Sequence, residues 1–136
     1  MANTLKLEIV TPDAKTFSED VEMVTLPASE GEMGIYPMHV PLMTQIVAGE
    51  IAVRQGGKEL YLAVGDGFAE ITGSRVAVMT DMAIRAENID EAKAEEARQR
   101  AQARLAEKLD DEQMGLVNAA LAQSIAQLKV KRRTHS

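Results

Sequence analysis

The feature that most constrains the fold of this chain is a change in sequence pattern near residue 87. Before it, short runs of apolar and β-branched residues are separated by glycine and proline. After it, residues 87–109 contain neither glycine nor proline and are rich in alanine, glutamate, lysine and arginine, which are strong helix formers. Strand patterns followed by helix patterns indicate an α+β chain with two successive parts, which we place at residues 1–86 and 87–136.

The first part has the pattern of an antiparallel β-sandwich or barrel, because short strands recur at a spacing of roughly 8–12 residues. The run LKLEIV alternates apolar and polar side chains, and TPDAKT after it has turn chemistry. A second short strand, VEMVTLP, is expected to stop at Pro27. Gly56-Gly57 joins IAVRQ to KELYLAV as a two-residue hairpin turn, and Gly73-Ser74 joins FAEIT to RVAVMT in the same way.

The second part predicts two antiparallel helices joined by a short turn. Asn88 is a natural N-cap for the first helix, and Glu91 three residues later completes a capping-box-like pair. Asp110 or Asp111 can cap a second helix, which is expected to end near Lys131. Apolar residues spaced by three or four positions predict one buried stripe along this second helix: Met114, Val117, Leu121, Ile125 and Leu128.

The seam between the two helices is made mostly of alanine on the first helix: Ala94, Ala97, Ala101 and then Leu105. An alanine seam buries little apolar area, and at about 25 cal/mol per Å² such a hairpin is only weakly held. Short helices are marginal in water without tertiary packing. We therefore expect the hairpin to dock on the β-domain or on a partner, and to be able to exchange one for the other.

Composition argues against most enzyme chemistries. The chain has no cysteine, which excludes a disulfide scaffold, a zinc-thiolate site and a cysteine nucleophile. Its two histidines, His39 and His135, belong to no metal-binding pattern, and no phosphate-binding glycine loop is present. No apolar run approaches the roughly 18–20 residues of a membrane helix, and the N-terminus lacks a leader pattern. We expect a soluble, non-enzymatic binding or coupling module without a metal site.

Charge is distributed unevenly along the chain. Residues 1–87 carry 6 Lys/Arg and 13 Asp/Glu, and residues 88–136 carry 9 and 8, so the parts hold −7 and +1 and sum to −6. The segment after Glu112 has no acidic residue. A basic tail on an acidic protein is a candidate electrostatic contact, and a solubilising chain end is the alternative. Nucleic acid is a poor partner because the tail has no aromatic neighbours: it consists of Lys129, Lys131, Arg132 and Arg133.

The stretch SEGEMGIYPMHVPLM, Ser29–Met43, combines two glycines, two prolines and His39. Together with GGKELYLAVGDGFAEI and VMTDMAIRAENIDEAKAEEA, it closely resembles the epsilon subunit of bacterial F-type ATP synthases, over essentially the whole chain. The resemblance implies an N-terminal β-sandwich and a C-terminal helical hairpin. It also implies a non-catalytic rotor subunit of the central stalk, held peripherally at the cytoplasmic face of the bacterial inner membrane through the complex alone.

The partners that this resemblance implies are the gamma subunit, the membrane c-ring and the alpha and beta subunits of the catalytic head. The hairpin would lie folded on the β-domain or extend toward the head and inhibit ATP hydrolysis. The four basic tail residues would then meet an acidic loop of the beta subunit. The resemblance places the c-ring contact in a protruding loop, at Glu32, Met33, Met38 and His39. A solvated Glu32 and a hydrogen-bonded loop histidine are the structural alternatives.

No cofactor is required, but some members of this family bind ATP between the two helices. Their signature corresponds to Ile89-Asp90-Glu91-Ala92-Lys93-Ala94, where lysine replaces an arginine and loses its bidentate geometry. Gln123 and Gln127 stand where those members have further arginines. ATP sensing is therefore the alternative function, and helix capping is the structural alternative for Asp90. The implied ATP contacts are Ile89, Asp90, Lys93, Ala94 and Arg100.

Overall fold

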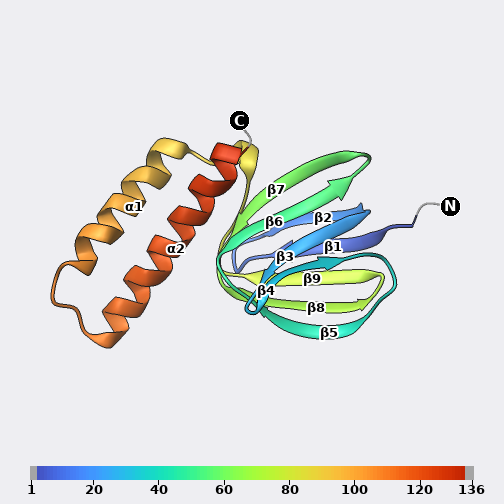
Figure 1. Cartoon of the computed structure of the whole chain (residues 1–136), viewed down its shortest axis with the longest axis horizontal. Helices are drawn as coiled ribbons and strands as arrows, with labels where there is room; N and C mark the ends of the chain where they lie inside the picture. Colours follow the sequence, from blue (N-terminus) through green and yellow to red (C-terminus); the bar gives the residue numbers. More distant parts are fainter. Residues whose placement is uncertain (1–2, 134–136) are drawn as a thin grey trace.

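Within residues 3–133, which a computed structural model of the chain describes, ten β-strands precede two long α-helices (Figure 1). His135 lies outside the described residues. The strands are β1 (Leu5–Val10), β2 (Lys15–Val21), β3 (Met23–Ala28), β4 (Gly31–Ile35), β5 (His39–Ile46), β6 (Gly49–Gln55), β7 (Lys58–Val64), β8 (Gly67–Gly73), β9 (Arg75–Thr80) and β10 (Ala83–Arg85). A short 3₁₀ helix, η1 (Ala86–Asn88), leads to the helices α1 (Glu91–Leu105) and α2 (Asp111–Arg133).

The strands form two facing layers, one of β4-β3-β6-β7-β10 and one of β5-β8-β9-β1-β2. The layers are continuous where Ala28 of β3 pairs with Ile46 of β5. One apolar cluster fills the space between them and draws buried side chains from both, including Phe17, Leu26 and Ile71. The predicted β-sandwich followed by a two-helix hairpin is therefore confirmed.

The two predicted hairpins are also confirmed. β6 and β7 pair antiparallel from Gly49–Val64 to Gln55–Lys58, and the turn between them places both Gly56 and Gly57 at positive φ, 58° and 78°. A two-residue turn of this hand suits glycine because a side chain there would strain the backbone. β8 and β9 form the second hairpin. β1 and β9 run parallel, whereas the other strand pairs in the described part of the chain are antiparallel.

Two strand boundaries differ from the sequence-based expectation. The strand β3 continues past Pro27 to Ala28, so the predicted stop at proline is wrong. Pro27 is tolerated because β3 changes partner there, from β6 at Thr25 to β5 at Ala28. The carbonyl of Pro27 accepts a hydrogen bond from Val47 N at 2.9 Å, while proline has no N–H to satisfy. The strand β2 was not predicted separately, because its sequence KTFSEDV is mostly polar.

The helix ends show which caps the chain uses. Asp90, not Asn88, caps α1, and its Oδ1 accepts a hydrogen bond from Lys93 N at 3.1 Å. The prediction of Asn88 is wrong because this residue closes η1 and the backbone is extended at Ile89. The predicted cap of α2 is confirmed at Asp110, whose Oδ1 accepts from Gln113 N at 2.7 Å. The Gln113 side chain accepts in return from Asp110 N at 3.2 Å.

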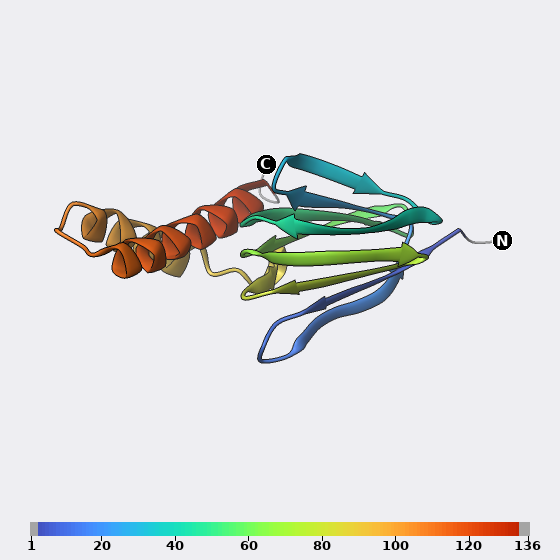
Figure 2. The ribbon, with the colours of Figure 1, turned by 90° about the horizontal axis from the view of Figure 1, so that it is seen from below.

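The alanine seam between the helices is confirmed, since Ala94 and Ala101 are buried against α2. The predicted stripe on α2 is only partly buried. Val117 and Leu128 are buried, but Ile125 is 47% exposed. The helix is buried on a second face instead, because Ala126 and Val130 pack against the sandwich. Figures 1 and 2 show that the hairpin extends from one end of the sandwich, opposite the end at which β1 begins.

Candidate functional site

The stretch from Ser29 to Met43 forms two strands and a turn, so the prediction of a protruding loop is wrong. β4 pairs with β3 from Ala28–Gly31 to Val24–Ile35, and β5 pairs with β8. Between them Tyr36, Pro37 and Met38 turn the chain, and Met38 has a positive φ of 68°. The turn therefore links two strands that pair with different neighbours, and the stretch is not a free loop.

The residues implied in c-ring contact are not gathered at one point. Glu32 lies opposite Pro27 and lines one recess with Lys129 and Arg133 of α2, at the end of the sandwich that faces the helices. Met38 and His39 lie at the other end, where His39 pairs with Gly73. About six residues of strand separate the two levels, or roughly 20 Å at 3.3 Å per residue. Both positions lie along the side of the sandwich that β4 and β5 form.

The end of the sandwich away from the helices, the distal end, exposes large apolar side chains. Tyr36 is 57% exposed, Met38 81% and Val40 71%. His39 is held by its own neighbour, since its Nδ1 lies 2.6 Å from the carbonyl oxygen of Val40. This contact is the structural alternative proposed from the sequence, and it leaves the rest of the imidazole ring available. The distal end is therefore an apolar corner with one histidine beside it.

A second apolar surface was not predicted from the sequence. Phe68 on β8 pairs with Met79 on β9, and both are about half exposed. Met43 on β5 pairs with Glu70, two residues from Phe68, so it lies on the same outward face. We call Met43, Phe68 and Met79 the outer apolar patch. Alternation could have revealed it, because Ala69 and Ile71 point into the core and Phe68 must then point outward.

An acidic recess lies where the last turn of α2 meets β6 and β7. It has a volume of about 440 Å³, and its charged lining consists of Glu32, Glu50, Glu59, Lys129 and Arg133. Arg133 Nε donates to Glu50 Oε2 at 2.7 Å, and its guanidinium lies 5.2 Å from the centre of the Tyr61 ring. The hydrogen bond with Glu50 raises the pKa of Arg133. The recess thus holds a cation among carboxylates and an aromatic ring.

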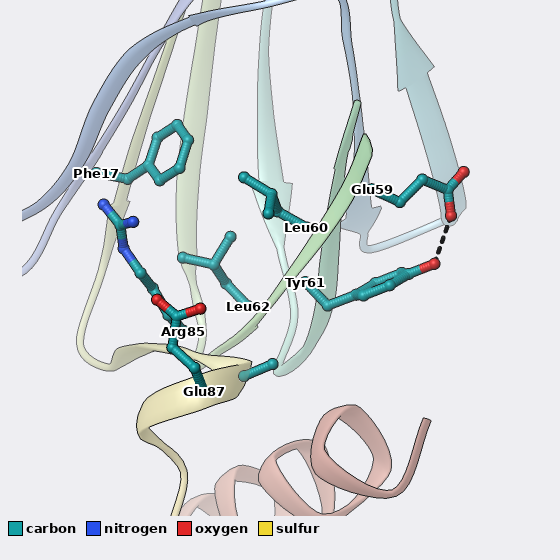
Figure 3. Close-up of a pocket in the computed structure, with 8 residues that line it drawn as sticks. Phe17, Glu59, Leu60, Tyr61, Leu62, Arg85 and Glu87 are labelled. Atoms are coloured by element: carbon teal, nitrogen blue, oxygen red, sulfur yellow. Dashed lines mark hydrogen bonds between the residues drawn. The ribbon is translucent and has the colours of Figure 1, made fainter. Parts of the chain in front are cut away.

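Tyr61 also borders a groove that β7 shares with β2 and β10 (Figure 3). Its hydroxyl donates to Glu59, and this hydrogen bond raises the pKa of Tyr61. On the other side of the groove the Arg85 guanidinium stacks 5.0 Å from the centre of the Phe17 ring and donates to the carbonyl of Thr16. Arg85 therefore joins the edge strands β10 and β2 and covers the core at this edge.

The residues implied in ATP contact occupy different environments. Ile89 is buried against the sandwich and Ala94 within the hairpin. Asp90 caps α1 through a carboxylate oxygen, which is the role that the sequence offered as the alternative to ATP contact. Lys93 is exposed on the same turn. Arg100 lies about two turns further on, in an apolar groove with Leu116 and Val117. The five residues therefore do not converge on one recess.

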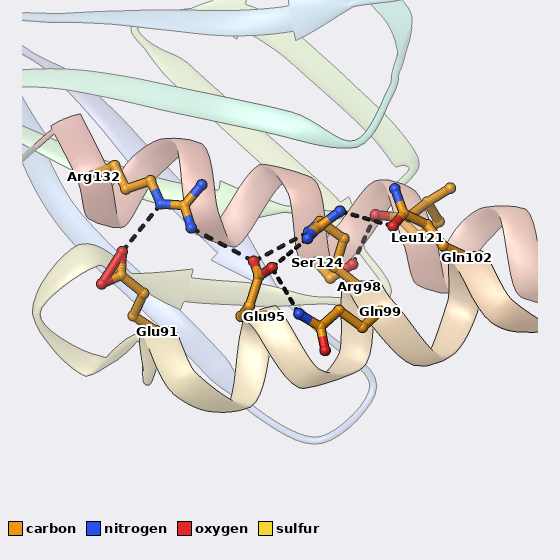
Figure 4. A network of polar contacts seen from close by, with 8 residues as sticks. All are labelled: Glu91, Glu95, Arg98, Gln99, Gln102, Leu121, Ser124 and Arg132. Atoms are coloured by element: carbon orange, nitrogen blue, oxygen red, sulfur yellow. Dashed lines mark hydrogen bonds and ion pairs between the residues drawn. The ribbon is translucent and has the colours of Figure 1, made fainter.

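A polar network occupies the space between α1 and α2 near the sandwich (Figure 4). Arg132 Nε donates to Glu91 at 3.1 Å, and Glu95 receives contacts from both Arg132 and Arg98. The interaction with Arg98 lowers the pKa of Glu95. Lys131 Nζ donates to the carbonyl of Ala86 at 3.3 Å. Three of the four basic tail residues are therefore bound within the chain when the hairpin is docked, and Lys129 lines the acidic recess.

Comparison with known families matches both parts of this structure. A model of the β-sandwich domain of the ATP synthase delta/epsilon chain matches residues 4–86. A model of the long α-helix domain of the same chain matches residues 87–132. The chain belongs to the ATP synthase delta/epsilon family. The resemblance seen in the sequence is confirmed, and with it the assignment to a non-catalytic subunit of this family.

Individual relatives support this assignment over nearly the full length. The ATP synthase epsilon chain of Desulforamulus reducens is 42% identical over 129 residues, which cover 95% of this chain and 98% of the relative. That of Dehalococcoides mccartyi is 46% identical over 134 residues, which cover 96% of each.

Solved structures agree with the fold. A chain in the OSCP/F1/c-ring structure of the Euglena gracilis mitochondrial ATP synthase superimposes with a TM-score of 0.78 at 26% identity, over 95% of this chain and 81% of that one. A chain in the central stalk/c-ring structure from Tetrahymena thermophila has a TM-score of 0.62 at 10% identity, over 97% of this chain and 96% of that one, and supports the fold alone. Within the described residues, no helix has the length and apolar character needed to cross a membrane.

Proposed function

We propose that this chain is the central-stalk rotor subunit that couples rotation of the c-ring to the catalytic head of a bacterial F-type ATP synthase. The observation that carries the proposal is the match of both family models in their native order, over residues 4–132. The subunit would act at the cytoplasmic face of the inner membrane, held there by its partners. Its hairpin would inhibit ATP hydrolysis when it leaves the sandwich and reaches the head.

The outer apolar patch is the surface we assign to the gamma subunit. Met43, Phe68 and Met79 are 63%, 54% and 47% exposed and lie on three adjacent strands. Large apolar side chains that adjoin on a rigid sheet are typical of protein interfaces, because their burial supplies most of the binding energy. The patch lies on the layer that does not carry the hairpin, so gamma binding is compatible with a docked hairpin.

The side formed by β4 and β5 is the surface we assign to the c-ring. A single partner can touch Glu32, Met38 and His39 only if it lies along this side, because Glu32 sits at a different level from the other two. Met33, the fourth residue of the predicted contact, is partly buried and packs against the core of the sandwich. Within residues 3–133, neither β4 nor most of β5 has a strand partner on this side, which leaves backbone groups available for polar contacts. The contact would therefore be long and shallow.

Gamma binding tests this proposal. The variant Phe68→Glu should weaken association with purified gamma at least about tenfold, because it buries a charge within an apolar interface. Leu116→Glu is the matched control, since Leu116 is equally apolar, is 68% exposed and lies on the hairpin. A parent chain that fails to form a stoichiometric complex with gamma would overturn the rotor assignment. If both variants lose gamma binding equally, the outer apolar patch is not the gamma-binding surface.

A further inference from the structure

The hairpin is attached to the sandwich through a small contact. The sandwich is contacted mainly by the C-terminal half of α2, which lies on β6, β7 and η1, whereas α1 packs on α2. The buried apolar part of the contact consists of Ala63, Ile89, Ala126 and Val130. Two of these four side chains are alanines, so apolar burial alone supplies a limited share of the docking free energy.

Polar contacts at three places supplement this apolar contact. Gln123 Nε2 donates to Asp81 Oδ2 at 3.2 Å, and Lys131 Nζ donates to the carbonyl of Ala86. The third is the charged pair of Arg133 and Glu50. The Glu50 side chain is only 10% exposed, whereas Gln123 and Asp81 meet as a neutral amide and an exposed carboxylate. A hydrogen-bonded ion pair with one mostly buried partner is the strongest kind among these contacts.

The surroundings of this pair select an arginine. Glu50 accepts from Nε, the Tyr61 ring lies beneath the guanidinium, and the negative charge of Glu32 also acts on Arg133. Tyr61 is itself held in place by its hydrogen bond to Glu59. A flat cation that donates from its edge and stacks on an aromatic face fits this recess, and a lysine ammonium would lose the stacking geometry.

We propose that the acidic recess of Glu32, Glu50 and Glu59 is an arginine receptor that latches the C-terminal turn of α2 and sets how often the hairpin leaves the sandwich. The latch itself is argued from the docked structure alone, and only its effect on the catalytic head rests on the proposed function. Arg133 belongs to the basic tail assigned to the beta subunit, and in the docked state it is engaged by Glu50 of the sandwich, whereas Arg132 pairs with α1 inside the hairpin. The latch and the contact with the head therefore exclude each other. When the hairpin is released, its arginine leaves the carboxylates of the acidic recess and meets those of the beta subunit.

Distance measurement on the intact chain tests the latch. The chain has no cysteine, so Lys58→Cys at the β6–β7 turn and Ala103→Cys on α1 give unique positions for spin labels. Arg133→Gln and Glu50→Gln should each raise the population of long distances about tenfold, as expected when a charged hydrogen bond is removed. Arg104→Gln is the matched control, because in the described part of the chain the ion pair of Arg104 is a local one with Glu107. Arg133→Lys should restore only part of the docked population, because lysine keeps the charge but loses the stacking on Tyr61.

A latch also predicts dependence on salt. Raising the salt concentration of the parent chain should increase the long-distance population, because Arg133 is half exposed and its attraction to the recess is screened. An Arg133→Gln variant that matches Arg104→Gln, together with a salt-independent parent, would overturn the proposal. Gamma binding by the same variants should be unchanged. Loss of gamma binding by the parent would contradict the rotor assignment and leave the latch intact.

Discussion

At the scale of residues, a hydrogen bond between two side chains of β7 makes the acidic recess sensitive to pH. Tyr61 donates to Glu59, and this hydrogen bond raises the pKa of Tyr61 above its ordinary value of 10.0. A raised pKa in the folded state means that the stabilisation is fully present below about pH 10 and is lost as pH rises through the folded-state value. Glu59→Gln should therefore lower the pKa of Tyr61 toward its ordinary value. A spectrophotometric titration in a Tyr36→Phe background isolates Tyr61, and an unchanged pKa would contradict the assignment.

At Gly65 the backbone lies so close to neighbouring side chains that only glycine, which has no Cβ, fits. A Cβ at this position would lie 2.0 Å from Asp81 Oδ1 and 3.1 Å from Gln123 Nε2. Gly65→Ala should displace the Asp81 carboxylate, break its hydrogen bond to Gln123 and lower the free energy of unfolding by about 1 kcal/mol. Denaturant unfolding measures this change. In a double-mutant cycle, Asp81→Ala should relieve part of it, and strictly additive effects would show that the two side chains do not clash.

At the scale of elements, α2 contains a glycine without a structural task. A Cβ at Gly115 would meet nothing within 4 Å, and the residue lies in the second turn of the helix. Gly115→Ala should stabilise this end of α2 by about 0.5–1 kcal/mol, because alanine loses less backbone entropy on helix formation. Amide hydrogen exchange of the first turns of α2 checks this. Gly57→Ala is the contrasting control and should destabilise, since Gly57 has a φ of 78°.

Elements with local signals were predictable, and those decided by tertiary contacts were not. The Gly56-Gly57 turn fixes its hairpin within four residues, so the sequence alone sufficed. The strand β2 has only Phe17 and Val21 buried and is defined by its pairing with β1. Asn88 and Asp90 are equally good caps, and the choice follows from Ile89, which must be buried against Ala126 and Val130.

For the candidate surfaces, the sequence could not predict which residues lie together, because this depends on the arrangement of the whole molecule. Resemblance named Glu32 and His39, but only the strand register shows that they sit at opposite ends of one side. The basic tail was evident from charge, whereas its engagement with Glu50 depends on how α2 packs on the sandwich, and that with Glu91 and Glu95 on how α2 packs on α1. Positions that lie far apart in the chain and meet across two domains leave no local signal in a single sequence.

The two parts of the molecule should also be separable. The core cluster of the sandwich contains no residue of α1 or α2, so deletion of residues 88–136 should leave the β-fold intact. The outer apolar patch is on the opposite layer from the hairpin contact, so the truncated chain should still bind gamma. If the hairpin inhibits the head, the assembled complex with the truncated chain should hydrolyse ATP severalfold faster than the complex with the full chain.

The truncation and the latch variant together identify the cause of such a change. Arg133→Gln weakens docking and also removes one basic tail residue, so its effect on hydrolysis reports which role dominates. Glu50→Gln weakens docking alone and leaves the tail complete, so it should increase inhibition and lower hydrolysis below that of the full chain. Circular dichroism and gamma binding verify that each variant is folded and assembled. Equal hydrolysis by the full and truncated complexes would show that the hairpin has no inhibitory role in this protein.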